Sequence, residues 1–174
     1  MNIMAFPSSD PEEARRQLQD IIDLYVRLQD PLNIDTAFVR SCTITAASLE
    51  TSTRPASISY AFTIGPYYRN DPTRKTVHGG AIALFFDSCT CMPIFLAKRN
   101  WGNTVGVTRT LSVTLFHPAM EGDKVTLDAE LVSIGKQVAT VRGVLRRDTD
   151  GVILATCQHD RVAPTSQTGY TLKL

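Results

Sequence analysis

The tripeptide His78-Gly79-Gly80 precedes an apolar run, AIALFFDSCTCMPIFLA, that extends from Ala81 to Ala97. Asp87 is the only charged residue between Gly80 and Lys98. A helix that is apolar on all sides belongs in the interior of a protein. A carboxylate within such a helix is costly to bury unless it is paired or used in chemistry. The stretch therefore predicts a core helix that carries a functional side chain, with the rest of the chain as a sheet wrapped around it.

An amphipathic helix is predicted before this stretch, over residues 11–29. Asp10 can cap its N-terminus, and Pro11 suits its first turn. Apolar residues then recur at helical spacing, with charged residues between them: Ala14, Leu18, Ile21, Ile22, Tyr25 and Leu28. We expect this helix to lie on the outside of the core.

Six segments have the alternation or the composition of β-strands. Two precede the core helix and four follow it: Phe38–Glu50, Ser57–Ile64, Thr104–Phe116, Lys124–Ile134, Gln137–Arg147 and Val152–Val162. Short turns predict that the last four strands form an antiparallel meander. The predicted fold class is α+β, with one domain over residues 1–174: an antiparallel sheet around a long apolar helix, plus the N-terminal helix. The Ser-, Thr- and Gly-rich tail, residues 164–174, is predicted to fray.

Composition excludes several classes of protein. The 174 residues carry a net charge of +1 and are 43% hydrophobic, which gives no general attraction to nucleic acid or to an anionic membrane. The apolar run approaches membrane-spanning length, but Asp87 and Pro93 favour a buried helix over a span. Residues 1–10 lack the pattern of a signal peptide. We expect a cytoplasmic protein, with a mitochondrial or peroxisomal location left open.

Cysteine and histidine spacing gives no sign of a metal site. The four cysteines include no CxxC pair, and we interpret them as small buried hydrophobic residues in a reducing compartment. The three histidines, His78, His117 and His159, lack the spacing of metal ligands. We expect neither a structural metal nor a cofactor.

The two ends of the central helix offer different chemistry. Backbone N–H groups at a helix N-terminus have no intrahelical partner and can hold a developing oxyanion, and glycine at positions 79 and 80 lets an acyl group approach them closely. Asp87 is a candidate nucleophile or general base. The alternatives are that Gly79-Gly80 only makes a sharp turn, and that Asp87 is only hydrogen-bonded to Ser88, Thr90 or a strand.

Spacing along the helix sets a condition on the functional interpretation. Asp87 lies eight residues beyond Gly79, about 12 Å along one helix. Groups that serve one reacting centre must lie near 3 Å from the substrate. If Gly79 and Asp87 act on one carbonyl, they come from different chains, which predicts a homodimer with two composite sites.

The motif resembles a known family, the hotdog-fold acyl-CoA thioesterases of the PaaI type, which include the animal acyl-CoA thioesterase 13 group. The likeness covers roughly residues 60–164. It rests on His78-Gly79-Gly80, the acid nine residues after the histidine, Gly106-Val107-Thr108, and Phe116-His117-Pro118-Ala119.

The resemblance implies a set of catalytic roles. Gly79 N–H would polarise a thioester carbonyl, and Asp87 of the partner chain would attack it or activate water. Thr108 matches a serine that positions the water or the carboxylate, and His78 would orient the loop and the thiol-leaving side. The family has an asparagine six residues before the histidine, where this chain has Pro72. Either Asn70 substitutes for it, or the group is missing.

The resemblance also implies an acyl-CoA or acyl-carrier thioester as substrate, with CoA present only as part of that substrate. Gly80 would border the acyl group, and basic residues would meet the CoA phosphates. Lys136 and His159 rank highest because they fall near family positions that touch the nucleotide, and further candidates are Arg69, Arg74, Lys75 and Arg161. The assembly expected is a homodimer, paired further into a dimer of dimers.

Two alternatives to thioester hydrolysis stay open. His78 with Asp87 could carry out dehydration or cyclisation in a polyketide pathway, as hotdog dehydratases pair a histidine with a helix acid. The chain could also be a non-catalytic acyl-binding module that keeps the pocket without turnover.

Overall fold

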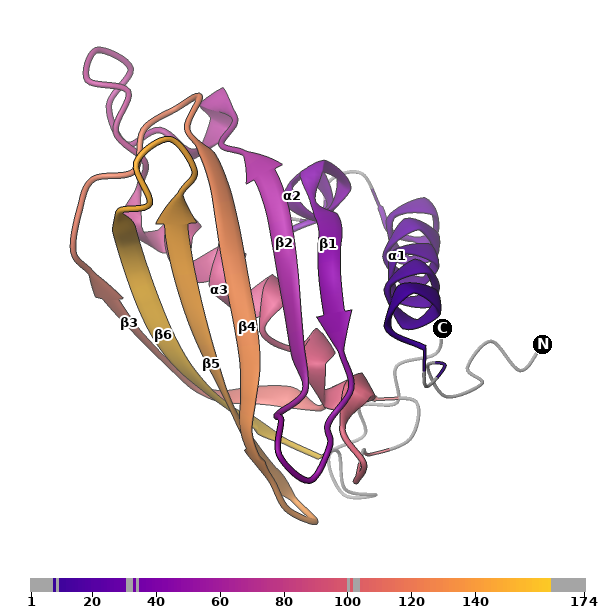
Figure 1. The fold of residues 1–174 in the computed structure, drawn as a ribbon. Coiled ribbons are helices and arrows are strands. Elements are labelled where there is room, and N and C mark those ends of the chain that lie inside the picture. Colours follow the sequence, from indigo (N-terminus) through magenta and orange to yellow (C-terminus); the bar gives the residue numbers. More distant parts are fainter. Residues whose placement is uncertain are drawn as a thin grey trace.

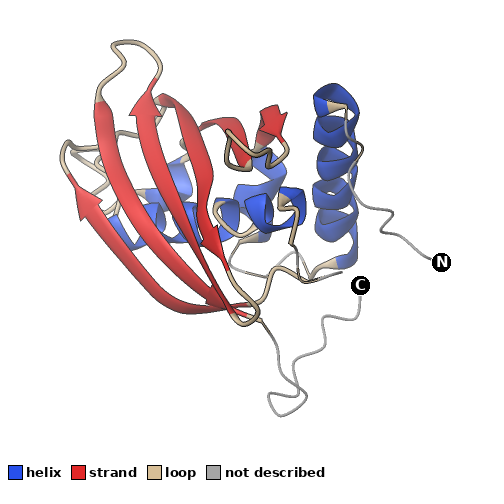
Figure 2. Ribbon diagram, turned by 60° about the horizontal axis from the view of Figure 1, so that its bottom comes forward, coloured by secondary structure: helices blue, strands red, loops and turns tan. Residues whose placement is uncertain are grey.

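A computed structural model describes residues 8, 10–30, 33, 35–99, 101 and 104–163. The tail predicted to fray, residues 164–174, lies outside this range. One six-stranded antiparallel sheet curves around a central helix, and a second helix lies beyond one edge of the sheet (Figures 1 and 2). The predicted fold class is thus confirmed.

The strands follow the order β1-β2-β4-β5-β6-β3 across the sheet, and each pairs antiparallel with its neighbours. Their bounds are Thr43–Ser48 (β1), Ser57–Thr63 (β2), Val107–Leu115 (β3), Lys124–Ile134 (β4), Val138–Arg147 (β5) and Ile153–Val162 (β6). Side chains on β2, β4, β5 and β6 alternate between buried and accessible positions, so one face of the sheet packs against the core.

The prediction of a four-strand meander is wrong for β3. Only β4, β5 and β6 follow one another across the sheet, whereas β3 pairs with β6 at the far edge. The connection between β3 and β4, residues 116–123, is long enough to pass the ends of β5 and β6, so sequential strands need not be neighbours. This crossover leaves β3 as an edge strand, and most of its side chains are exposed.

The central helix α3 spans Gly79–Cys89 and buries Ile82, Phe85, Phe86 and Cys89. The Phe85 ring stacks on Phe38 at a centroid distance of 4.6 Å and meets Phe62 and Tyr68 edge-on at 5.3 and 5.0 Å. Aromatic pairs in these geometries add to the stabilisation from burial alone. The apolar run therefore packs against strand β2 and the segments beside it.

The apolar run is not one continuous helix. Regular α-helix ends at Cys89, and a 3₁₀ helix, η2, covers Met92–Leu96. The Thr90 hydroxyl donates back to Phe86 O at 2.6 Å, and Pro93 has no N–H to continue the ladder. Residues Gly79–Leu96 have the length and the mean hydropathy, 1.6, of a membrane-spanning helix, but 56% of them are buried in the fold. Core packing accounts for this hydropathy.

The predicted strand Phe38–Glu50 begins with a helix instead. The short helix α2 spans Thr36–Ser41, and β1 starts only at Thr43. Phe38 is fully buried and lies between the Phe62 and Phe85 rings. Tertiary packing of this one aromatic side chain outweighs the β-propensity of the residues around it.

The N-terminal helix α1, Pro11–Leu28, confirms the predicted amphipathic helix. Its N-cap, Asp10, accepts a hydrogen bond from Glu12 N–H at 2.9 Å. The helix covers the outer edge of β1, where Gln19 Oε1 accepts from Ile44 N–H at 2.9 Å and Arg15 donates to Ile44 O at 3.3 Å. An exposed strand edge is a template for unwanted pairing, so α1 protects this side of the sheet.

Gly143 on β5 leaves room for the Phe86 ring of α3 against the sheet. A Cβ atom at this position would lie 2.7 Å from the Phe86 ring and 2.8 Å from Cys157 Sγ. We predict that Gly143→Ala lowers the free energy of unfolding by about 1–3 kcal/mol, because an added methyl group overpacks this contact. Urea-induced unfolding measures the change. Gly135→Ala is the matched control, since its Cβ would meet only ordinary contact at 3.5 Å; equal effects in both variants would contradict the packing argument.

Candidate active site

The structure places the predicted residues in two groups at opposite ends of α3. His78, Gly79 and Gly80 form the N-terminus of the helix, after the loop that contains Asn70 and Arg74. Asp87 lies near the C-terminus beside β3 and β6, together with Thr108, His159 and Arg161. Lys136 is exposed in the turn between β4 and β5. The separation expected from the sequence therefore holds within one chain.

At the first end, His78 is the N-cap of α3. Its Nδ1 accepts a hydrogen bond from Gly80 N–H at 2.9 Å, and its own N–H donates to Tyr68 O at 2.8 Å. Within the described part of the chain, Gly79 N–H donates to no protein acceptor. Of the two glycine N–H groups, Gly79 is thus the one free to bind a substrate oxygen, since the helix N-terminus carries partial positive charge.

The loop before α3 keeps Asn70 and Arg74 at the surface. Asn70 is exposed, and its backbone N–H donates to Thr76 O at 2.7 Å. The Arg74 side chain is 80% exposed and lies 3.9 Å from Asp71. Neither side chain contacts Asp87 or its neighbours in the described part of the chain.

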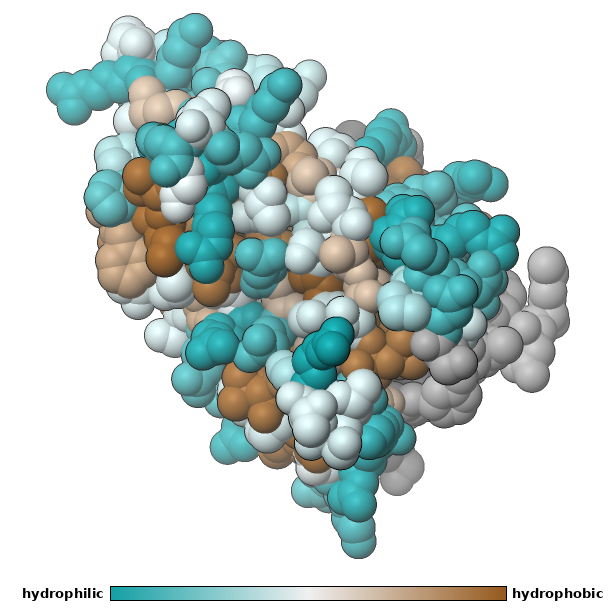
Figure 3. All heavy atoms as spheres, in the orientation of Figure 1, coloured by the Kyte–Doolittle hydropathy of each residue, from teal (hydrophilic) through white to brown (hydrophobic). Residues whose placement is uncertain are grey.

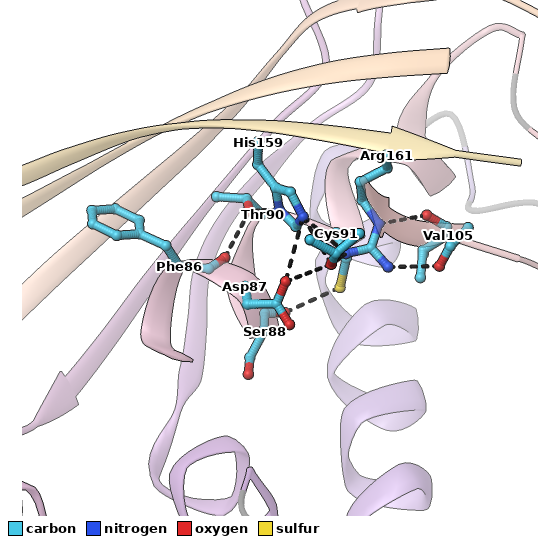
Figure 4. A network of polar contacts seen from close by, with 10 residues as sticks. Phe86, Asp87, Ser88, Thr90, Cys91, Val105, His159 and Arg161 are labelled. Carbon is cyan, nitrogen blue, oxygen red and sulfur yellow. Dashed lines mark hydrogen bonds and ion pairs between the residues drawn. The ribbon is translucent and has the colours of Figure 1, made fainter. Parts of the chain in front are cut away.

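Near the C-terminus of α3, a side chain of β3 holds the Asp87 carboxylate in place. Thr108 donates from Oγ1 to Asp87 Oδ1 at 2.6 Å, and Arg161 Nη1 donates to Thr108 Oγ1 at 3.2 Å. Figure 4 shows Asp87 on α3 below His159 and Arg161 of β6. The Asp87 side chain is 43% exposed, and within the described residues its Oδ2 accepts no hydrogen bond. One carboxylate oxygen is therefore fixed by the protein, and the other is available to a ligand.

Arg161 is a buried cation behind this carboxylate. The residue is only 7% exposed, and its Nε and Nη2 donate to Val105 O at 2.7 Å and Gly106 O at 2.6 Å. Gly106 has a φ of +73°, and a Cβ there would lie 2.4 Å from Val162 O, so only glycine fits. The guanidinium thus donates to groups of the protein itself, and its contact with a CoA phosphate stays a prediction.

His159 lies behind Asp87, and its contact with the nucleotide of CoA stays a prediction. Its side chain is fully buried, with Nε2 3.4 Å from Asp87 Oδ1 and Nδ1 2.6 Å from Thr90 Oγ1. Because the Thr90 hydroxyl donates to Phe86 O, it accepts from Nδ1–H, and Nε2 faces Arg161 Nη1 at 3.4 Å. These partners fit a neutral imidazole.

Burial and, next, the nearby Arg161 charge lower the pKa of His159 from 6.5 to about 4, whereas Asp87 and Asp160 act in the opposite direction. Thr90 is the member of this cluster that sequence reasoning did not place in the site. The signal for it was its position three residues after Asp87, on the same side of a helix.

The neutral state of His159 predicts a pH-dependent stability. The unfolded chain binds a proton at this residue below about pH 6.5, whereas the folded chain resists protonation until about pH 4. The free energy of unfolding should therefore fall across this window as the pH drops, by up to about 3 kcal/mol. Urea unfolding at several pH values measures the slope.

Two variants separate this effect from general acid denaturation. His159→Gln should have a flatter slope than wild type, whereas His117→Gln, at an exposed position, should keep the wild-type slope. The prediction is wrong if NMR titration shows that the His159 ring of the folded protein takes up its proton near pH 6.5.

Comparison with known proteins gives a consistent result. Residues 74–154 match the family model of the thioesterase superfamily. Mouse acyl-coenzyme A thioesterase 13 is 28% identical over 86 residues, which are 49% of this chain and 59% of that protein. The match thus spans less than two thirds of the length of this curated relative.

Solved structures share the fold over most of the chain. Zebrafish thioesterase superfamily member 2 has a TM-score of 0.68 at 17% identity, over 86% of this chain and 97% of that one. The E. coli PaaI protein from the phenylacetic acid degradation operon has a TM-score of 0.58 at 14% identity, over 85% and 97%. The central part of the chain is thus similar to the thioesterase superfamily, and the chain has the hotdog fold of these structures.

Proposed function

We propose that this protein hydrolyses the thioester of an acyl-CoA or an acyl-carrier substrate, at sites formed between two copies of the chain. The match of residues 74–154 to the thioesterase superfamily model and the similarity to an acyl-CoA thioesterase support the reaction class. The main observation behind the proposal is the position of Asp87. Its carboxylate has one oxygen free to act on a substrate, and the same residue lines an apolar cavity.

In the proposed reaction, Asp87 Oδ2 removes a proton from a water molecule as the water oxygen attacks the thioester carbonyl carbon. The carbonyl oxygen then carries negative charge and accepts a hydrogen bond from Gly79 N–H of the partner chain. Collapse of this intermediate breaks the carbon–sulfur bond, and the leaving thiolate takes the proton from Asp87. The products are a carboxylic acid and a free thiol, and no cofactor takes part.

The geometry of β3 supports the pairing of two chains. Thr108, near the start of β3, holds Asp87, whereas Leu115, at its end, lies next to the N-terminus of α3, with Cδ1 3.1 Å from a Cβ placed on Gly79. If two copies of this edge strand pair antiparallel about a two-fold axis, the start of one strand lies opposite the end of the other. Asp87 of one chain then lies on the same side as Gly79 of its partner.

The surface at this edge fits such an interface. Leu115, Phe116 and Ile153 are 52%, 55% and 37% exposed, and apolar atoms gather over the end of β3 at the left of Figure 3. The opposite edge, β1, is covered by α1 (Figure 1). Contiguous exposed apolar surface marks interaction sites, and β3 is the sheet edge left open to a second copy.

We predict that Asp87→Asn lowers kcat for thiol release from acyl-CoA by about 10²-fold or more, because the amide cannot accept the proton. Thr108→Val should lower the rate less, since it removes only the hydrogen bond that positions Oδ1, and Thr108→Ser should restore the rate. A thiol-trapping assay measures both. Asp20→Asn, at an exposed position on α1, is the matched control. An Asp87→Asn rate equal to wild type would remove Asp87 from the mechanism.

We predict that Gly79→Pro folds but loses about 10²–10³-fold in kcat, the usual cost of one oxyanion donor. Proline is favoured in the first turn of a helix, and the extended conformation of His78, with φ −66° and ψ 134°, suits the residue before proline. The substitution thus deletes the N–H with little change of backbone. Gly79→Ala keeps the N–H and should lose much less activity.

Mixing these variants tests the composite site. In a mixed dimer, an Asp87→Asn chain supplies an intact Gly79 and a Gly79→Pro chain supplies an intact Asp87, which rebuilds one of the two sites. Random mixing should restore roughly a quarter of wild-type activity. Light scattering verifies that dimers form. Absence of any recovery from verified mixed dimers would place Gly79 and Asp87 in separate or intrachain sites.

A further inference from the structure

An apolar cavity of about 260 Å³ runs from Asp87 into the body of the same chain, between α1, α2 and α3. Its walls combine residues from the N-terminal helices with residues from the central segment: Ile22, Phe38, Val39, Tyr60, Met92 and Phe95. None of the wall formed by α1 and α2 belongs to residues 74–154, the part that matches the family model. The family pattern therefore specifies only part of the cavity wall, and α1 and α2 supply another part.

Most polar side chains in the cavity lining have partners within the protein. The Tyr25 hydroxyl donates to Asp35 Oδ2 at 3.0 Å, and the Tyr60 hydroxyl donates to Cys89 O at 3.0 Å. Arg161 donates to backbone carbonyls.

The lining thus has few unpaired polar groups. A ligand that enters it gains mainly from apolar burial, because each methylene group removed from water contributes favourably.

We propose that this cavity binds the acyl chain of the thioester, so that α1 and α2 set the chain length that the protein accepts. The inference rests on the proposed function, which places the thioester carbonyl at Asp87. The acyl chain then enters the cavity of the chain that supplies Asp87, and the CoA or carrier arm leaves toward the partner. An apolar chain gains nothing from displacing the Tyr25–Asp35 hydrogen bond, so it packs along the apolar part of the lining.

The small volume argues for a chain of medium length. Cavities that enclose whole drug-sized ligands span about 300–1,000 Å³, and this cavity of about 260 Å³ lies below that range. It suits an aliphatic chain or a single ring rather than a long-chain fatty acyl group. Thioesters that differ only in acyl length are therefore the informative probes.

Filling the cavity from α1 tests the proposal. Ile21 is half-buried in the cavity wall, and Leu28, 60% exposed on the same helix, lies outside the lining. Ile21→Trp should lower kcat/KM for decanoyl-CoA and hexanoyl-CoA by about tenfold or more, but leave acetyl-CoA within about twofold. Leu28→Trp, the matched control, should keep the wild-type profile. Cooperative urea unfolding of each variant verifies the fold.

Binding provides a readout that does not need turnover. Isothermal calorimetry with non-hydrolysable S-alkyl-CoA thioethers should show affinity that rises with alkyl length in wild type and in Leu28→Trp, but not in Ile21→Trp. Turnover with an unchanged length profile in Ile21→Trp would overturn the acyl site and leave the proposed function standing. Length-dependent binding without any turnover would overturn the proposed function and keep the acyl site. If the protein shows neither turnover nor length-dependent binding, the proposed function and the acyl site are both overturned.

Discussion

The packing of Phe85 and Phe86 against the sheet determines where Asp87 points. Phe85 lies among the Phe38, Phe62 and Tyr68 rings, and Phe86 meets the bare backbone at Gly143. Successive residues on a helix are turned by about 100°, so two buried rings leave the next side chain directed away from this core. Asp87 consequently reaches the start of β3, where Thr108 holds it. Apolar packing thus fixes the rotation of α3 about its axis, and this rotation determines where the Asp87 carboxylate lies.

The electrostatics behind Asp87 follow from the same arrangement. A buried arginine is costly unless its donors are satisfied, and Arg161 donates to two backbone carbonyls and to the Thr108 hydroxyl. Burial first, and the charge of Arg161 second, disfavour a proton on His159 and lower its pKa to about 4. The site therefore combines one anion at the surface, one cation beneath it and a neutral imidazole between the helix and the sheet.

One edge of the sheet is covered and the other is exposed, and this difference links the fold to the proposed chemistry. On the β1 side, α1 satisfies the N–H and C=O of Ile44 and walls a cavity that reaches Asp87. On the β3 side, the strand edge and the side chains of Leu115 and Phe116 remain exposed. One edge is thus suited to enclose a ligand within the chain, and the other is suited to receive a second copy.

Sequence patterns alone predicted the N-terminal helix, the buried central helix, most of the strands and the separation of Gly79 from Asp87, because periodicity and helical rise are local properties. The pattern also named Asp87 as a site residue, whereas Thr108, His159 and Arg161 were named through the family resemblance and the CoA substrate that it implies. Sequence patterns did not predict that β3 lies at the edge beside β6, that Phe38 begins a helix, or that His159 and Arg161 are buried behind Asp87 with Thr90. Those features depend on contacts between residues far apart in the chain, such as Thr90 with His159 and Phe38 with Phe85. Local pattern determines which face of an element is apolar, but only the tertiary structure decides which other element covers that face.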